Sequence, residues 1–218
     1  MTDLTLIQKI AMWALPLIFA ITLHEVAHGY VAYLLGDYTA KLSGRLSLNP
    51  IKHIDLIGTI VVPLLMMTVS SFIFGWAKPV PVDPRNFKHM RRDLAMVALA
   101  GPLSNLLMAV IWGLIAKIGM MLRMSGNDWL GVPLIYMGGA GIMLNVVLGV
   151  LNLIPIPPLD GGKLLEAMLP KRVAYKVSLI EPYGFFILIL LMLSGLLFTI
   201  MAPIVSGIIA AIGDVYGL

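Results

Sequence analysis

The sequence predicts an all-α polytopic membrane protein with about four to six transmembrane helices, and three observations carry this prediction. The 218 residues are 60% hydrophobic and 12% charged, whereas soluble domains carry about 25% charged residues. The mean hydropathy is +0.97. A first long apolar segment, residues 10–36, is followed by further runs that exceed the roughly 18 residues of a transmembrane candidate and carry no charge: residues 56–77, 94–116, 129–159 and 182–213.

Length and residue types limit what else the chain can be. We expect residues 1–218 to form a single membrane-embedded domain, because no room is left for an added soluble module. There is no cysteine, which excludes disulfides, thiolate metal ligands and a cysteine nucleophile. The net charge of +4 does not indicate a nucleic-acid partner, because the basic residues lie in loops beside apolar segments, as is usual for membrane proteins.

The first apolar segment carries three ionisable groups within five positions, in the stretch LHEVAHGY (residues 23–30). His24 and His28 are four positions apart, so in a helix both imidazoles project from one face, with Glu25 beside it. HExxH on a helix is a zinc-binding pattern in which the glutamate serves as general base. Without a metal, each ionisable group at membrane depth would cost about 2.5 kcal/mol or more. We therefore expect one zinc ion per chain.

A catalytic zinc site usually has three protein ligands and a water, so the motif predicts a third ligand elsewhere. Asp160 follows an apolar run within the proline-rich stretch NLIPIPPLDGGK (residues 152–163). Prolines forbid regular helix there, and irregular backbone at membrane depth is tolerated where it lines a cavity. Gly161 and Gly162 permit close backbone approach. On the residues alone, Asp160 is as compatible with a role as helix N-cap as with a role as the third metal ligand.

LHEVAHGY, AGPLSN (residues 100–105) and NLIPIPPLDGG together resemble the site-2 protease family of intramembrane zinc metalloproteases, over about two thirds of the chain. The resemblance implies that zinc is bound by His24, His28 and Asp160. It also implies that Glu25 is the catalytic acid/base. Asn152 matches the family's asparagine ahead of the DG motif, which makes it a candidate to bind the substrate backbone or the oxyanion; the alternative is a hydrogen bond at the end of its own helix.

Two further features bear on the resemblance. Asn105, in AGPLSN, is interpreted as a helix-packing residue, since Gly101 and Ser104 are small residues typical of helix interfaces. The chain contains no peptide-binding PDZ insertion, so the resemblance is to a short form of the family.

The function implied by the resemblance is hydrolysis of peptide bonds in or near the transmembrane segments of other membrane proteins, as in regulated intramembrane proteolysis. The expected partners are these substrates and the lipid bilayer, and the expected location is the cell membrane, with several spans. One alternative is a transporter of metal ions or protons, because intramembrane His, Glu and Asp also mark ion pathways; no internal repeat supports it. A second alternative is a non-catalytic scaffold of the same fold.

One shared zinc ion requires the segments at residues 10–36 and 129–159 to run parallel. If every apolar segment crossed the membrane, these two segments would run antiparallel. We therefore predict that residues 56–77 are re-entrant. Their flanks, GRLSLNP (residues 44–50) and AKPVPV (residues 77–82), are extended and able to pair as a β-hairpin-like element. This topology puts twelve basic residues on one face and two on the other, with Lys117 left out as buried in a helix end. The positive-inside rule then places the active site near the cytoplasmic face.

Two expectations concern the remaining segments. A substrate helix hides its peptide bonds in its own hydrogen bonds, and the two extended flanks are candidates to replace those bonds by strand addition. Residues 182–213 are compatible with one span plus an interfacial helix after Pro203, or with a tight hairpin.

Overall fold

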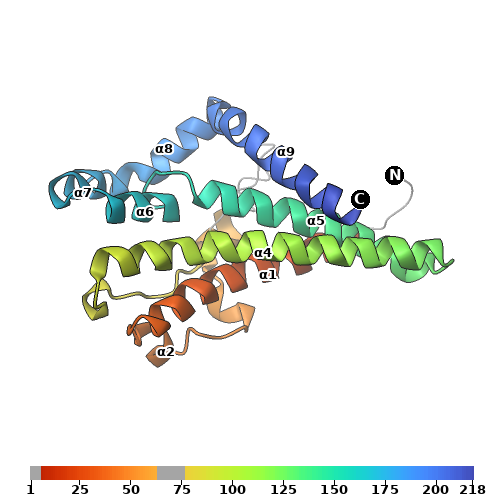
Figure 1. Ribbon diagram of the computed structural model, residues 1–218, viewed down its shortest axis with the longest axis horizontal. Helices are drawn as coiled ribbons and strands as arrows, with labels where there is room; N and C mark the ends of the chain where they lie inside the picture. Colours follow the sequence, from red (N-terminus) through yellow and green to blue (C-terminus); the bar gives the residue numbers. More distant parts are fainter. Residues whose placement is uncertain (1–5, 63–76) are drawn as a thin grey trace.

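Figure 1 shows the computed structural model of the protein, which describes residues 6–62 and 77–218. Within these ranges the chain is helical and contains no strand, so the predicted all-α architecture is confirmed. The α-helices are α1 (Leu6–Leu34), α2 (Thr39–Leu42), α4 (Met90–Met124), α5 (Asp128–Asn152), α6 (Asp160–Met168), α7 (Lys171–Ser178), α8 (Glu181–Leu193) and α9 (Leu196–Tyr216). Short helical turns are η1 (Pro50–His53), η2 (Leu56–Val61) and η3 (Pro84–Asn86).

Four of the described helices are long and apolar enough to cross a membrane. They are α1 (from Met12), α4, α5 and α9. Helices α7 and α8 are bent by 64° relative to each other and supply a fifth span if the bent pair is counted as one. Many large apolar side chains on these helices are exposed, as expected where lipid rather than protein covers them. The protein is therefore a multi-pass membrane protein.

Small residues bring α4 and α5 together as an antiparallel hairpin (Figure 1). A Cβ atom on Gly138 would lie 2.5 Å from the Cβ of Ala116, and one on Gly141 would lie 2.2 Å from the ring of Trp112. Close helix packing in membranes depends on such residues, because lipid and apolar side chains are equally apolar. Gly138 and Gly141 thus set the spacing of the central hairpin.

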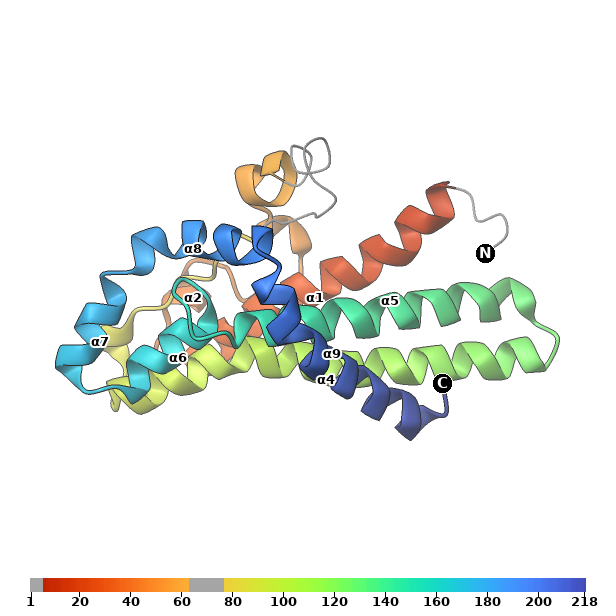
Figure 2. The same cartoon turned by 90° about the horizontal axis from the view of Figure 1, so that it is seen from above.

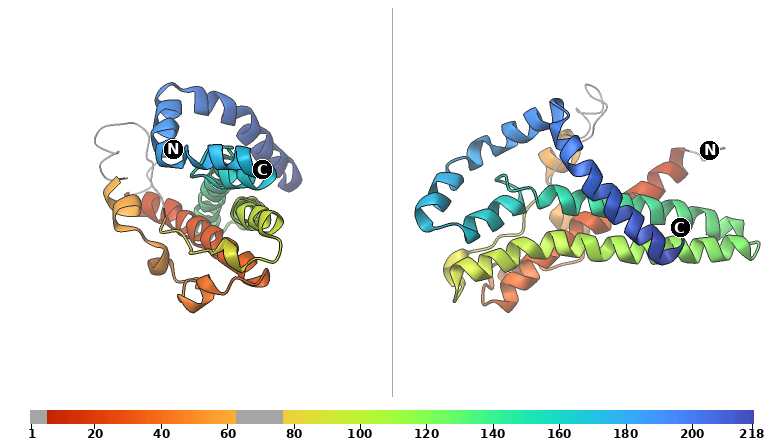
Figure 3. Two further views of the ribbon diagram at one scale, coloured as in Figure 1. Left: turned by 90° about the vertical axis from the view of Figure 1, so that its left-hand side faces the viewer. Right: turned by 45° about the horizontal axis from the view of Figure 1, so that its top comes forward.

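The other helices pack on this hairpin from two sides. Seen end-on, α4 and α5 lie between α1 and the C-terminal helices α8 and α9 (Figure 3, left). Helix α1 runs in the same direction as α5 and opposite to α4 (Figure 1). The parallel arrangement that a shared zinc ion requires of the first and fourth apolar segments is therefore present.

The C-terminal apolar segment breaks at Gly195 and not at Pro203. Gly195 has φ +73°, a left-handed conformation that glycine adopts without strain, and it separates α8 from α9. Pro203 lies inside α9, so the first of the two alternatives left open for this segment, an interfacial helix that begins after Pro203, is not found. Helix α9 crosses α4 and α5 (Figure 2), and Leu197 and Met201 join their core.

The two extended flanks lie against each other, as predicted, but they contact through side chains rather than as a β-ladder. Arg45 Nη2 donates hydrogen bonds to the carbonyl oxygens of Lys78 at 2.7 Å and Pro79 at 3.3 Å. The backbone N–H of Lys78 donates to the carbonyl of His53 at 2.9 Å. Of the segment predicted to be re-entrant, residues 56–77, the part at 63–76 lies outside the described residues.

Candidate metal centre

Three potential metal ligands from distant parts of the chain converge at one point. His24 and His28 lie one turn apart on α1, and Asp160 is the first residue of α6. The Nε2 atoms of the two histidines are 3.0 Å apart. Asp160 Oδ2 lies 3.1 Å from His24 Nε2 and 3.0 Å from His28 Nε2. Within the described ranges, this is the one cluster of three His, Asp or Glu side chains spaced to hold a metal ion.

The triangle of ligand atoms fits a small tetrahedral cation. Bonds of about 2.0–2.1 Å at tetrahedral angles separate ligand atoms by roughly 3.3–3.4 Å, and the three edges here are nearly equal and a few tenths of an ångström shorter. Two imidazoles and one carboxylate with a free fourth position are also the donor set of catalytic zinc. Geometry and chemistry therefore both fit zinc.

Each imidazole makes a hydrogen bond through Nδ1, and this bond orients the ring so that the lone pair of Nε2 faces the other ligand atoms. His24 Nδ1 lies 2.5 Å from Asn105 Oδ1, and His28 Nδ1 lies 2.7 Å from the carbonyl oxygen of Val97. Both partners are acceptors, so each Nδ1 carries the proton and each Nε2 presents its lone pair. Partners of this kind fix the ring orientation in metal sites.

Asn105 is itself held at the centre of a buried network. Its Nδ2 donates to Asn145 Oδ1 at 3.0 Å and to the carbonyl of Ala20 at 3.3 Å. Asn145 Nδ2 donates to the carbonyl of Gly141 at 2.9 Å. Both asparagine side chains are fully buried. These bonds join α1, α4 and α5, and they orient the amide so that its oxygen faces His24.

The interpretation of Asn105 as a helix-packing residue is therefore incomplete, because its side chain contacts a metal-ligand candidate directly. Gly101, one turn earlier on α4, faces the same site: a Cβ atom there would lie 2.3 Å from His28 Nε2 and 2.6 Å from His24 Cε1. Gly101 and Asn105 are four positions apart and therefore lie on one face of α4. In a helix that must pack on α1, this spacing is the sequence signal that points to contact with the histidines.

Asp160 belongs to the proline-rich stretch at residues 152–163, here called the arm. Glycines in this stretch let the backbone fold tightly. A Cβ atom on Gly161 would lie 2.3 Å from the carbonyl oxygen of Leu153, and one on Gly162 would lie 2.4 Å from the nitrogen of Pro157. The predicted close approach of Gly161 and Gly162 is thus confirmed. Asp160 belongs to the first turn of α6, whose N-cap is Leu159, so its carboxylate faces the histidines instead of capping the helix.

Two contacts from other helices fix the arm and α6. On α8, Gly184 packs so closely on the arm that a Cβ atom would lie 1.6 Å from the carbonyl oxygen of Pro157. On α4, Arg91 donates to the carbonyl oxygens of Ala167 and Leu169 at the end of α6. Both ends of the unit that carries Asp160 are therefore anchored to the bundle.

Glu25 lies beside the histidine pair on α1, and its carboxylate accepts a hydrogen bond from another segment of the chain. Its Oε2 accepts a hydrogen bond from the backbone N–H of Val80 at 2.8 Å. Val80 belongs to the AKPVPV segment, 55 positions away in the chain. This contact could not be predicted from the sequence, because no local pattern links the two segments.

Asn152, predicted as a substrate or oxyanion ligand, ends α5. Its Nδ2 donates to the carbonyl oxygen of Leu148 at 3.0 Å. This is the helix-end hydrogen bond that the sequence left open as the alternative, and the substrate role stays a prediction.

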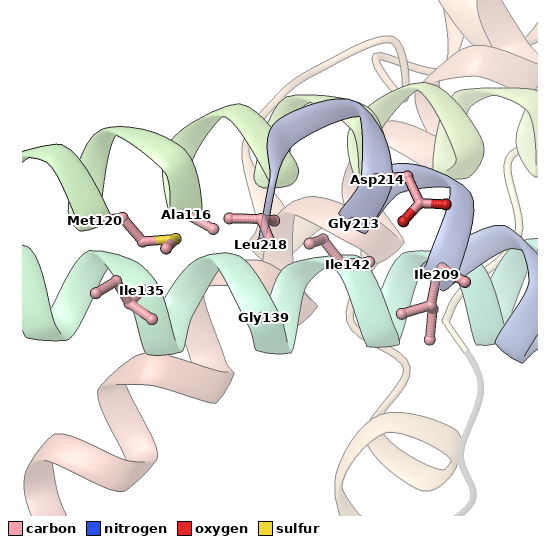
Figure 4. A pocket seen from close by; sticks show the side chains of 10 residues that line it. Ala116, Met120, Ile135, Gly139, Ile142, Ile209, Gly213, Asp214 and Leu218 are labelled. Atoms are coloured by element: carbon pink, nitrogen blue, oxygen red, sulfur yellow. The ribbon is translucent and has the colours of Figure 1, made fainter.

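A cavity of about 440 Å³ lies between α4, α5 and α9 (Figure 4). None of its described lining residues belongs to the histidine pair or is Asp160. It is mostly apolar, and among its described lining residues Asp214 has the one ionisable side chain. Its lining is Ala116, Met120, Ile135, Gly139, Ile142, Ile209, Ala210, Gly213, Asp214 and Leu218. A single carboxylate does not match the three-ligand set of a catalytic zinc site.

A bundle of apolar helices that gathers an HExxH pair and a distant aspartate around one point defines a membrane metalloprotease. Comparison with known proteins agrees. Residues 116–195 match peptidase family M50. The “Putative zinc metalloprotease YwhC” of Bacillus subtilis is 41% identical over 182 residues, which cover 84% of this chain and 80% of the relative.

More distant relatives carry related names. The “Putative zinc metalloprotease Rip2” of Mycolicibacterium smegmatis is 28% identical over 86% of this chain and 67% of its own length. The “Zinc metalloprotease MJ0392” of Methanocaldococcus jannaschii is 26% identical over 80% of this chain and 40% of its own length. No solved structure matches the chain. The chain belongs to peptidase family M50, a family of zinc metalloproteases, and zinc is its cofactor.

Proposed function

We propose that the protein is an intramembrane zinc endopeptidase that hydrolyses peptide bonds in or near the transmembrane segments of other membrane proteins, as in regulated intramembrane proteolysis. One observation carries the proposal. His24, His28 and Asp160 present three ligand atoms within 3.1 Å of one another inside a bundle of membrane-spanning helices, and Glu25 lies on the same helix turn as the histidines.

In this proposal His24, His28 and Asp160 bind the zinc ion. Held there, the metal would supply a Lewis acid for the scissile carbonyl and would lower the pKa of the attacking water to about 7. Glu25 removes a proton from the attacking water and returns it to the leaving amine. Asn105 and the carbonyl of Val97 hold the imidazoles in the required tautomer. Asn152 binds the substrate backbone or the oxyanion after it releases the carbonyl of Leu148.

The substrate must unwind locally, and it then needs replacement hydrogen-bond partners. Of the two extended flanks, residues 44–50 are better suited to pair with it. Among the described residues the N–H groups of Arg45, Ser47 and Asn49 donate hydrogen bonds, whereas the N–H groups of Leu46 and Leu48, which alternate with them, donate none. Alternate groups on one side of an extended segment are what strand addition uses.

The active site is proposed to lie toward the cytoplasmic face. Helices α2, α6 and α7 and the start of α4 lie at one end of the bundle, and the α4–α5 connection lies at the other (Figure 1). The first group carries Lys41, Arg91, Arg92, Lys163, Lys171, Arg172 and Lys176, whereas the second carries Arg123. An excess of Lys and Arg marks cytoplasmic loops.

The test uses the full chain purified in detergent micelles and a membrane-protein substrate in the same micelles. Wild type is expected to hold one zinc per chain and to cut the substrate. His24→Ala and Asp160→Ala should lose both properties, while Glu25→Gln should keep zinc and lose cleavage. His89→Ala, at an exposed histidine outside the site, is the control and should match wild type.

The outcome also separates the two alternative functions. Zinc or proton flux into proteoliposomes that persists in Glu25→Gln, with no cleavage by wild type, would establish a transporter. Neither flux nor cleavage in wild type would leave a scaffold.

A further inference from the structure

The stretch Pro79–Val80–Pro81 presents a single backbone donor beside the metal centre. Proline has no N–H group, so Val80 supplies the one N–H of these three residues. That N–H donates to Glu25 Oε2 at 2.8 Å. Residues 77–82 thus contact α1 through a defined backbone atom and the carboxylate assigned to catalysis.

Contacts on both sides of Val80 hold this donor in place. Before it, Arg45 binds the carbonyl oxygens of Lys78 and Pro79, and the N–H of Lys78 binds the carbonyl of His53. After it, the N–H of Asp83 donates to the buried carboxylate of Asp37 at 2.8 Å. The segment is therefore fixed at both ends of the short run that faces Glu25.

A glycine on α1 allows this approach. Gly29 lies one turn after Glu25, and a Cβ atom there would lie 2.8 Å from Val80 Cγ1 and 2.8 Å from Leu46 Cδ2. The Leu46 side chain can rotate away, but Val80 is buried and stiff at χ1. Only glycine at position 29 lets the Val80 backbone come this close to the helix.

We propose that the backbone N–H of Val80 is a positioning group for the general base: it holds one carboxylate oxygen of Glu25 and leaves the other to face the reacting water. The proposal rests on the proposed function. It also assigns residues 79–81 to the catalytic apparatus and not to a substrate-pairing edge, because two of their N–H groups are absent and the third is occupied.

Amide hydrogen exchange tests the contact independently of zinc and of activity. In metal-free protein labelled with ¹⁵N-valine, the Val80 amide should exchange about tenfold faster or more in Glu25→Ala than in wild type, because its hydrogen-bond acceptor is lost. Glu25→Gln retains an acceptor oxygen and should stay near the wild-type rate. Equal rates in all three proteins would overturn the proposal.

Activity tests the consequence. Val80→Pro deletes the donor. Val82→Pro is the control, since it adds a proline to the same segment at a position whose N–H makes no hydrogen bond to any described residue. Val80→Pro should lower kcat about a hundredfold, the scale expected for a misplaced catalytic group, with KM and zinc content unchanged. Val82→Pro should retain wild-type kcat.

The outcomes separate the two proposals. If wild type cleaves, Glu25→Gln does not, and Val80→Pro keeps full kcat, the positioning role fails while the protease assignment stands. If wild type does not cleave at all, the protease assignment fails, and amide exchange still reports whether Val80 binds Glu25. If Val80→Pro does not fold, the exchange rates decide.

Discussion

His24 Nδ1 on α1 lies 2.5 Å from Asn105 Oδ1 on α4, 81 positions away. This hydrogen bond joins a metal-ligand candidate to a side chain that is fully buried and bonded in turn to Asn145. The orientation of the His24 ring therefore depends on packing between α1, α4 and α5, and not on α1 alone.

Asn105→Ala is expected to weaken zinc binding by about 10- to 100-fold, the usual effect of removing a partner behind a ligating histidine. Asn145→Ala, which leaves the His24 contact in place, should have a smaller effect. Competition with a chelator of known affinity measures both. Wild-type affinity in Asn105→Ala would show that the contact does not orient the ring.

Gly101→Ala should abolish stoichiometric zinc binding. The added Cβ would lie 2.3 Å from His28 Nε2, and tightly packed interiors do not absorb such an overlap without moving the rings. Zinc content by elemental analysis is the measurement. Gly139→Ala, where a Cβ would meet nothing within 4 Å, is the matched control and should bind zinc as wild type does.

Gly184→Ala should displace the arm that carries Asp160. A Cβ would lie 1.6 Å from the carbonyl oxygen of Pro157, and overpacking of this kind costs about 1–3 kcal/mol. We expect a lower thermal midpoint in micelles and weaker zinc binding together. Gly207→Ala on α9 has open space around its Cβ and should change neither quantity. Normal zinc affinity in Gly184→Ala would show that α8 does not brace the arm.

Asp37 should make stability depend on pH at the acid end. Burial alone raises the pKa of its carboxyl, but hydrogen bonds from the Thr39 hydroxyl, the Asn86 amide and the N–H groups of Asp83 and Thr39 reverse this, and the pKa is lowered below its ordinary value of 3.8. A lowered folded-state pKa stabilises the protein above the unfolded-state pKa, and this contribution is lost as pH falls through the folded-state value.

The corresponding variant is Asp37→Asn. The difference in thermal midpoint between wild type and Asp37→Asn should be largest near pH 6 to 7 and should shrink below about pH 4, where the unfolded carboxyl becomes protonated. A difference that stays constant from pH 7 to pH 3 would contradict this role of Asp37.

The sequence was sufficient to predict features that rest on short-range rules or on composition. The apolar runs predict the spans, and the i and i+4 spacing of His24 and His28 places both rings on one face. The requirement for a third ligand, together with the family resemblance, selected Asp160, and the structure brings it within 3.1 Å of both histidines.

Other features were out of reach because they depend on contacts between distant segments. The bond between Glu25 and Val80 depends on how residues 77–82 lie on α1, and no periodicity encodes that. An asparagine at position 105 suits both helix packing and the orientation of His24, so the residue type does not distinguish the two roles. The C-terminal apolar segment breaks at Gly195 and not at Pro203, because membrane helices tolerate proline, whereas a left-handed backbone conformation ends a helix.

The separation of His28 and Asp160 by 132 positions has a consequence for the chain as a whole. An ion bound by both residues acts as a cross-link that closes a very long loop, and in the chain-entropy account a covalent bridge over about 100 residues restricts the unfolded ensemble by about 4–5 kcal/mol. In the proposed site, zinc would tie the beginning of the protein to its C-terminal third. A chelator would then remove both the metal needed for the proposed cleavage and the cross-link that would stabilise the fold.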